Sequence, residues 1–340
     1  MAILSLQLYP YSVKIKIQRI GEEVFKLDKN KKIHRTSIGG QAVIEGVMMR
    51  GPKGIAIAVR TPDGSITIDK KPVQSLSMKY KILKAPILRG IVAFFESMIV
   101  GVKSLMFSAE FYELEGEEEE QPSKFDKFLE KLFGDKLQDV LIYFSVITAL
   151  LFGIGLFILL PTVVVGFIRK LVENHIVANI AEGVLRISIF LTYIILISRM
   201  KDIQRVFQYH GAEHKTIHCY ERNEELTIEN VRKYTTLHPR CGTSFLLIVM
   251  VVSIVMFSFI SWQNIWIRLI SRLLLLPLVA GISYEVIKFA GRSEHPVTCL
   301  ISKPGMMLQK FTTREPDDSQ IEVAIEALKN VLPENREDDK

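Results

Sequence analysis

Four long apolar runs constrain the fold of this chain more than any other feature. Residues 141–168 carry no charged side chain, and three further runs are also rich in aliphatic and aromatic residues: 183–198, 243–261 and 265–284. A helix crosses the core of a bilayer with about 20 apolar residues. The mean hydropathy of +0.24 and the 49% share of hydrophobic residues are too high for an ordinary soluble enzyme. The sequence therefore predicts a mainly α-helical, polytopic membrane protein with about four transmembrane helices.

Two other patterns lie before the first apolar run. Large apolar side chains recur at every second position in residues 55–59, and apolar and polar side chains alternate in residues 65–69, on the two sides of a Thr-Pro-Asp-Gly turn. This pattern predicts a small N-terminal β element. Between residues 86 and 107, Arg89, Glu96 and Lys103 recur every seven positions and would form one polar stripe on a helix. This stripe favours an amphipathic helix that lies along the membrane interface. The alternative is a helix packed inside the protein with its charges facing a polar cavity.

These patterns divide the chain into four parts. We expect an N-terminal region with the β element at residues 1–76, followed by amphipathic helices and an acidic linker at 77–139. The transmembrane core follows at 140–290 and contains a histidine-rich loop at 200–242, and residues 291–340 form a C-terminal tail. Eight Lys and Arg residues lie between the second and third predicted spans, whereas the turn between the third and fourth has none. By the positive-inside rule, this loop and both termini are cytoplasmic.

Charge and cysteine content exclude two classes of protein. The formal net charge of +6 is spread along the chain and forms no basic stripe with interleaved aromatic residues, so we expect no nucleic-acid partner and attribute the charge to anionic lipid headgroups. The three cysteines fall in segments assigned to the cytoplasmic side, so no disulfide framework is predicted. The first 30 residues lack the pattern of a cleaved signal peptide.

A short motif in the basic loop predicts chemistry. His210-Gly211-Ala212-Glu213-His214 has the H-x-x-E-H order of inverted zinc proteases. On a helix, His210 and His214 would face one divalent metal, most simply Zn²⁺, and Glu213 would take a proton from a water held by that metal. The competing interpretation is a pair of hydrogen-bonded histidines on a solvated helix, and Gly211 weakens the helix that the metal geometry needs.

The remaining ligands are open to more than one assignment. Glu285 follows His214 by 71 residues and would re-emerge on the same membrane face, so it is our first choice for a third ligand, with Glu294 as the alternative. A second hypothesis is a structural zinc site whose four positions are all filled by protein, built from His218, Cys219, His238 and Cys241. Such a site would be chemically inert.

Three segments resemble a known family. Residues 38–52, 209–215 and 238–244 are similar, in the same order, to motifs of the YqhQ-like family of bacterial membrane proteins, and the resemblance covers roughly residues 35–315. That family has been described as uncharacterised or as predicted metal-dependent enzymes, so the resemblance implies a bacterial cytoplasmic membrane and favours a metal without supplying a substrate. The positions it carries over are Glu45, Arg50, His210, Glu213, His214, Lys215, His238, Arg240 and Cys241.

The sequence thus favours a metal-dependent hydrolase at the cytoplasmic membrane face, with Arg240 stabilising developing negative charge. Its substrate would be a peptide or a lipid-linked group. One alternative is a non-catalytic assembly or scaffold protein with a structural metal or histidine cluster. The other is a solute carrier whose path is lined by Arg89, Glu96 and Lys103. The bilayer is the one partner the sequence predicts directly, and homo-oligomerisation is left open.

Overall fold

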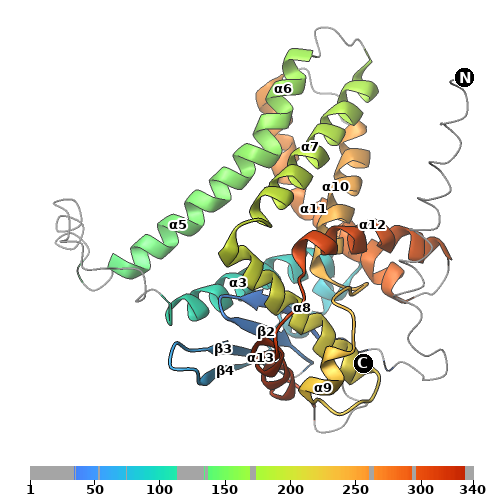
Figure 1. Ribbon diagram of the computed structural model, residues 1–340. Helices are drawn as coiled ribbons and strands as arrows, with labels where there is room; N and C mark the ends of the chain where they lie inside the picture. Colours follow the sequence, from blue (N-terminus) through green and yellow to red (C-terminus); the bar gives the residue numbers. More distant parts are fainter. Residues whose placement is uncertain are drawn as a thin grey trace, which may run out of the picture.

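The computed structural model describes residues 34, 36–52, 54–73, 75–112, 134, 137–168, 174–259, 264–292 and 296–333. Figure 1 shows two regions: upright apolar helices in the upper half, and a small sheet with shorter helices below them. The acidic linker at residues 113–120 and Glu294, the alternative third ligand, lie outside the described residues.

The predicted N-terminal β element is confirmed as a four-stranded antiparallel sheet. Its strands are β1 (Gly39–Val43), β2 (Gly46–Arg50), β3 (Gly54–Arg60) and β4 (Ile66–Pro72), in the order β1-β2-β3-β4. The predicted turn joins β3 to β4, where Gly64 has a φ of 85° and so takes a conformation that favours glycine. Because β1 is an edge strand, it has backbone N–H groups that the sheet does not use.

Helices cover both faces of this sheet. On one face Val43, Met48 and Ile57 pack against Val100 and Phe107 of α3 (Leu88–Ala109). The opposite face packs against α8 (Lys201–Glu221) and α13 (Asp318–Lys329), around a core that includes Val47, Tyr209 and Ile321. Alternation along each strand places successive side chains on opposite faces, which explains the two separate cores.

The upright helices account for most of the apolar sequence. A long helical stretch runs through α5 (Leu137–Ile154), a π-helical turn (Gly155–Leu159) and α6 (Leu160–Ile168). It is followed by α7 (His175–Ile197), α10 (Gly242–Ser258) and α11 (Ile265–Arg292). Within the described residues, four stretches are long and apolar enough to cross a membrane: Leu88–Ala109, Tyr143–Phe167, Ile176–Ile197 and Trp266–Phe289. The predicted number of four is confirmed.

Two of the apolar helices differ from the prediction. The stretch Leu88–Ala109, expected along the interface, meets the length and composition of a span, while Gly242–Ser258 is a shorter apolar helix of 17 residues. Two charges of α3 have partners: Arg89 pairs with Glu285 of α11, and Glu96 lies 3.6 Å from Arg50. In Figure 1, α3 runs crosswise to α7 and α10, between them and the sheet.

The segment after α11 returns to the sheet. It forms α12 (Pro296–Thr312) and then α13, whose start is fixed by a capping box between Asp317 and Gln320. Ile321, Ile325 and Leu328 of α13 are buried. The C-terminal tail therefore contains an amphipathic helix that docks on its own protein. Two very short helices complete the lower region, α2 (Leu76–Lys79) and α9 (Ile228–Arg232).

Candidate metal centre

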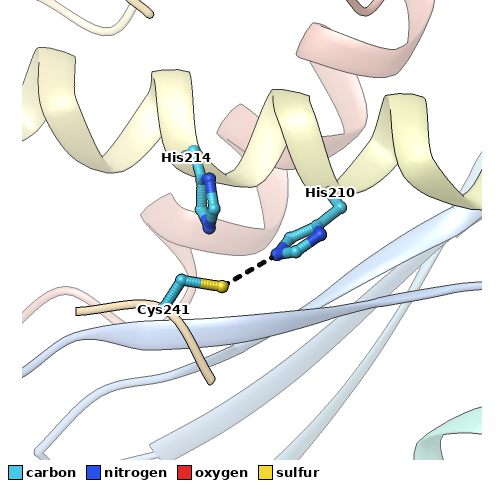
Figure 2. Close-up of side chains that lie close together, drawn as sticks. All are labelled: His210, His214 and Cys241. Carbon is cyan, nitrogen blue, oxygen red and sulfur yellow. Dashed lines mark hydrogen bonds between the residues drawn. The ribbon is translucent and has the colours of Figure 1, made fainter. Parts of the chain in front are cut away.

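The histidine motif lies on a single helix, as the chemistry requires. His210, His214 and His218 are all within α8, four residues apart, and therefore share one helical face. The rings of His210 and His214 have their centroids 4.4 Å apart. Figure 2 shows both rings pointing away from α8 toward the thiol of Cys241, the residue that precedes α10.

These three side chains form a candidate ligand set. One ligand atom each from His210, His214 and Cys241 lies within 4.8 Å of the others, and His210 Nε2 is 3.2 Å from Cys241 Sγ. Around a tetrahedral zinc, with bonds of about 2.0–2.3 Å, neighbouring nitrogen and sulfur ligands lie about 3.3–3.6 Å apart. The spacing of His210 and Cys241 already approaches this, and two imidazoles with one thiolate are ligands that zinc accepts.

Backbone carbonyls fix the orientation of the α8 imidazoles. Nδ1 of His210 donates to the carbonyl of Thr312 at 2.8 Å, and Nδ1 of His214 donates to that of Thr236 at 2.5 Å. This leaves Nε2 of each ring to act as ligand, and among the described residues Nε2 of His214 is buried without a hydrogen-bond partner. Metal-bound histidines typically donate their other ring N–H to such an acceptor. The residues present therefore fit a metal ion.

A second group lies directly beside the first. His218, Glu221 and His238 also offer ligand atoms within 4.8 Å of one another. The ring of His238 lies 5.4 Å from that of His214 and 4.8 Å from that of His218, so four imidazoles form a continuous row. Glu221 is already used: its Oε1 accepts hydrogen bonds from the backbone and hydroxyl of Thr36 and pairs with Arg240. The first group is the more available of the two.

Glu213 is held against the edge of the sheet. It is 4% exposed and accepts a hydrogen bond from the backbone of Gly40 in β1, while its Oε2 is buried with no hydrogen-bond partner in the described part of the chain. A Cβ at residue 40 would lie 2.9 Å from Cδ of Glu213 and 2.5 Å from the carbonyl of Met48, so this position requires glycine. The glycine-rich segment of β1 thus positions the carboxylate of the helix motif.

Gly211 also occupies a position where a side chain would not fit, which explains a glycine here despite its low helix propensity. A Cβ at this position would lie 2.0 Å from the carbonyl oxygen of Arg314, and the backbone of Arg314 donates to the carbonyl of Phe207 at 2.9 Å. The segment after α12 therefore lies directly on α8. Thr312, whose carbonyl orients His210, ends α12 just before this segment, so the missing side chain at Gly211 allows the contact that prepares a ligand.

Other residues carried over from the resemblance hold the site together. Arg240 donates to the carbonyl of Thr36 at 2.6 Å and pairs with Glu221. Lys215 is buried, donates to the carbonyl of Arg232 at 3.0 Å and pairs with Glu315.

The two remaining positions lie at the sheet. Glu45 occupies the turn between β1 and β2 with a positive φ of 49°, pairs with Arg205 and accepts from the hydroxyl of Tyr209 at 3.2 Å. Arg50 lies beside Glu96 of α3. Glu45 thus fastens the hairpin to α8, whereas Arg50 faces α3.

Two of the ligands predicted from spacing are not brought to the histidines. Glu285 pairs with Arg89 and accepts from the backbone of Ile87 at 3.3 Å, and it belongs to neither ligand group. Cys241 lies in the third ligand position that the sequence assigns to Glu285. The four-ligand site with Cys219 is not assembled either, because the thiol of Cys219 lies 3.5 Å from the carbonyl of Glu225, within the apolar core.

The electrostatics of the first group favour a thiolate. Burial alone would raise the pKa of Cys241, but the charges of His214 and His210 outweigh it and lower that pKa well below its usual value. Cys241 also caps the N-terminus of α10, where its Sγ lies 3.5 Å from the backbone nitrogen of Thr243. For His210, burial opposes protonation, yet the adjacent thiolate raises its pKa to about 9. Burial lowers the pKa of His218 to about 4 and raises that of Glu213.

This electrostatic balance predicts that metal binding strengthens as the pH rises. With a pKa of about 9, the ring of His210 carries on Nε2 at neutral pH a proton that a cation must displace. Displacement of one proton per cation makes the apparent affinity rise about tenfold per pH unit below pH 9 and level off above it. Competition titrations with Zn²⁺ at several pH values measure this slope. A flat affinity between about pH 7 and 9 would contradict it.

Several contributors were not found by sequence reasoning. They are the carbonyls of Thr236 and Thr312, the carboxylate of Glu221, and Gln309 of α12, whose amide binds the backbone N–H and C=O of His238 at 2.8 Å each. Backbone carbonyls leave no signal in a sequence. Glu221 and Gln309 gain their roles only through contacts with distant segments.

The helices and the cluster together define a multi-pass membrane protein with a buried group of histidine and cysteine side chains that could hold a metal ion. The chain belongs to the family described as protein of unknown function (DUF1385), whose profile matches residues 85–334. It is 37% identical over 299 residues to the Bacillus subtilis (strain 168) protein described as uncharacterized protein YqhQ, covering 86% of this chain and 92% of that protein. The predicted relationship to YqhQ is thereby confirmed. No solved structure gives a significant match.

Proposed function

We propose that this protein is a zinc-dependent hydrolase of the bacterial cytoplasmic membrane, with its metal held by His210, His214 and Cys241 at the inner face. The observation that supports this most is the unpartnered Nε2 of His214, buried 4.4 Å ring to ring from His210 and oriented by a carbonyl on its far side. Leaving a buried polar atom without a partner costs about 1–3 kcal/mol. A cation would remove that cost.

Three protein ligands leave one position open, which distinguishes hydrolytic from structural zinc sites. A bound Zn²⁺ would act as a Lewis acid and lower the pKa of water. The chain itself would supply Glu213 as the general base, because Oε2 of this carboxylate is unpartnered and burial raises its pKa above the usual value. Arg240 is committed to Glu221 and Thr36, so it would position the ligand loop.

A cavity that could hold a ligand lies across β1 from this centre. It has a volume of about 510 Å³, lies between the sheet and α3, and is lined by residues that include Gly40, Gln41, Arg50, Ser75, Met78 and Ser97. Gly40 contacts Glu213 on its other side, so only the backbone of β1 separates the cavity from the proposed base. Volumes of 300–1,000 Å³ are typical of ligand sites. The mixture of polar lining and exposed Met78 is consistent with a peptide or lipid-linked substrate.

The segment that links the sheet to α3 supports placement at the inner leaflet. Its large apolar residues Leu76, Met78 and Ile82 are each more than half exposed, and Lys79, Lys81 and Lys84 alternate with them. Apolar side chains with interleaved lysines bind at a membrane surface that contains anionic lipids. This arrangement would place the sheet, α8 and the histidine row on the cytoplasmic side.

A structural metal site is the second candidate, and one observation favours it. Nε2 of His238 is also buried without a hydrogen-bond partner in the described chain, 5.4 Å ring to ring from His214. If His238 turned to fill the fourth position, the centre would become inert and the protein would act as a scaffold.

Metal analysis of purified variants tests the ligand set. His214→Ala is expected to weaken zinc binding by about 100-fold, because about 10 kcal/mol of binding energy shared among three ligands gives about 3 kcal/mol for each. The measurement is zinc stoichiometry after purification in detergent, followed by competition titration. The matched control is His218→Ala, one helical turn further along the same face.

The control has its own expected result. His218→Ala should retain zinc with an affinity within about tenfold of the unmodified protein. Replacing a residue that only supports the metal ligands costs up to about 10–100-fold, and His218 is further from the proposed ion. Loss of zinc from His218→Ala but not from His214→Ala would assign the metal to the second group and overturn the proposal. A centre that binds four protein ligands would show equal losses in His214→Ala and His238→Ala.

A further inference from the structure

The cavity between the sheet and α3 contains one charged side chain. Among the described residues that line it, only Arg50 is charged, and its other polar side chains are Gln41 and four serines: Ser37, Ser75, Ser77 and Ser97. Arg50 is the last residue of β2, and its side chain is 33% exposed. A cavity that holds one cation among small polar residues suits an anionic group.

The guanidinium of Arg50 has donors to spare. Its Nη2 lies 3.6 Å from Oε2 of Glu96, a distance that allows charge attraction but is too long for a hydrogen bond. Oε1 of Glu96 is used elsewhere, because it accepts from the backbone of Leu76 at 2.7 Å and from the hydroxyl of Ser75 at 3.0 Å. Glu96 is not among the residues that line the cavity. Within the described part of the chain, Arg50 thus has a partner for its charge but no acceptor for its N–H groups.

A glycine keeps the space beside this guanidinium open. Gly39 of β1 lies directly opposite Arg50 in the register of β1 and β2, so a side chain here would stand next to that of Arg50. A Cβ at Gly39 would meet no atom within 4 Å, and Gly39 also lines the cavity. Close packing therefore explains the glycine at residue 40 but not the one at residue 39. Open space beside an arginine is what an anionic ligand needs.

The wall of the cavity continues into an apolar surface. Ser75, Ser77 and Met78 line the cavity and belong to the segment that links the sheet to α3. Met78 is 68% exposed, and Leu76 and Ile82 of the same segment are 55% and 73% exposed. Lysines in such a segment attract anionic lipids, and its large apolar side chains enter the acyl region. A lipid at this surface would reach the cavity with its headgroup while its chains cover the apolar side chains.

We propose that Arg50 binds the phosphate of an anionic membrane lipid in this cavity. A planar guanidinium binds phosphate oxygens with two parallel N–H donors, which matches the unused donors of Arg50. The exposed apolar wall at Met78 favours a lipid over a soluble anion. Binding of the lipid requires no metal; only the further step, that such a lipid is the substrate, rests on the proposed function.

Native mass spectrometry of the full chain in detergent tests this proposal. Titration with phosphatidylglycerol is expected to show saturable binding of a single lipid. Arg50→Gln should weaken it about tenfold or more, the effect of losing one charge-assisted hydrogen-bonded pair. Arg199→Gln is the matched control, because it removes an equal charge from an exposed position after α7 and should leave the binding unchanged. Arg50→Lys keeps the charge but loses the planar fork, so its affinity should be intermediate.

Gly39→Val separates this site from a general attraction between charges. The variant keeps Arg50 and adds a side chain that suits a β-strand, in the space beside the guanidinium, so it should also lose affinity for the lipid. Gly54→Val is its control. A Cβ at Gly54 would make only an ordinary contact of 3.6 Å with the carbonyl of Lys71, and Gly54 does not line the cavity, so this variant should bind the lipid normally.

Three results would overturn the inference. The first is equal affinity of Arg50→Gln and Arg199→Gln for phosphatidylglycerol. The second is displacement of the lipid by inorganic phosphate at millimolar concentration, which would indicate a site for a soluble oxyanion. The third is a loss of lipid in His214→Ala as large as in Arg50→Gln, which would move the phosphate to the metal centre. Lipid binding that persists in His214→Ala without zinc supports the lipid site, whatever the outcome for the proposed hydrolase.

Discussion

Glu213→Gln is expected to keep its zinc and to lose hydrolytic turnover by about 10²–10⁴-fold, the usual contribution of a general base. Glutamine has nearly the same shape, so its carbonyl can still accept from Gly40, and the ligands His210 and His214 are unchanged. It cannot, however, take up a proton. Turnover is measured with zinc-loaded protein in proteoliposomes, against a panel of membrane-associated peptides and lipid-linked esters.

The matched control replaces a carboxylate outside the centre. Glu229 is exposed in the first turn of α9, and Glu229→Gln should keep full turnover and full zinc content. Full turnover by Glu213→Gln would remove Glu213 from the chemistry. Loss of zinc together with turnover would instead show that Glu213 maintains the metal centre and is not a base.

Glu182→Gln is expected to lower the free energy of unfolding by about 3–5 kcal/mol, the cost of removing one partner of a buried ion pair. The change leaves the guanidiniums of Arg272 and Arg186 buried together with no carboxylate between them. Glu182 is 1% and Arg272 5% exposed, so little water reaches these charges to screen them. The free energy is measured by unfolding in mixed micelles of detergent and sodium dodecyl sulfate.

A surface ion pair provides the comparison. Glu322 pairs with Arg60 at 2.7 Å, and its side chain is 53% exposed. Glu322→Gln should cost less than about 1 kcal/mol, because solvent screens exposed charges and the side chains are less ordered. Similar losses in the two variants would show that Glu182 is solvated and that its ion pair with Arg272 is not a buried anchor.

Local patterns in the sequence were sufficient for several elements. The apolar runs identify α6, α7 and α11 because a bilayer demands uninterrupted hydrophobic length, and the alternation at residues 55–59 and 65–69 identifies the hairpin of β3 and β4. The i, i+4 spacing of His210 and His214 brings their rings together because both sit on one helix. Each of these features depends on residues close together in the chain.

The interfacial assignment of residues 86–107 shows where local patterns reach their limit. The stripe of Arg89, Glu96 and Lys103 predicts a surface that faces water or headgroups. In the structure, two of these charges have a partner from another segment: Arg89 pairs with Glu285 of α11, and Glu96 lies beside Arg50 of β2. Whether a charged side chain is solvated or paired depends on its neighbours in the fold, and the sequence does not supply those neighbours.

The sequence by itself determined that this chain enters a membrane and carries a helix with two imidazoles on one face, since both depend on hydrophobic length and helical period alone. Only the tertiary structure decided that Cys241, and not Glu285, meets those imidazoles, and that Arg272 takes the carboxylate that Arg186 also approaches. The physical reason is that a ligand or an ion pair needs contact at about 2–4 Å. Residues separated by tens of positions reach such distances only through the packing of whole helices.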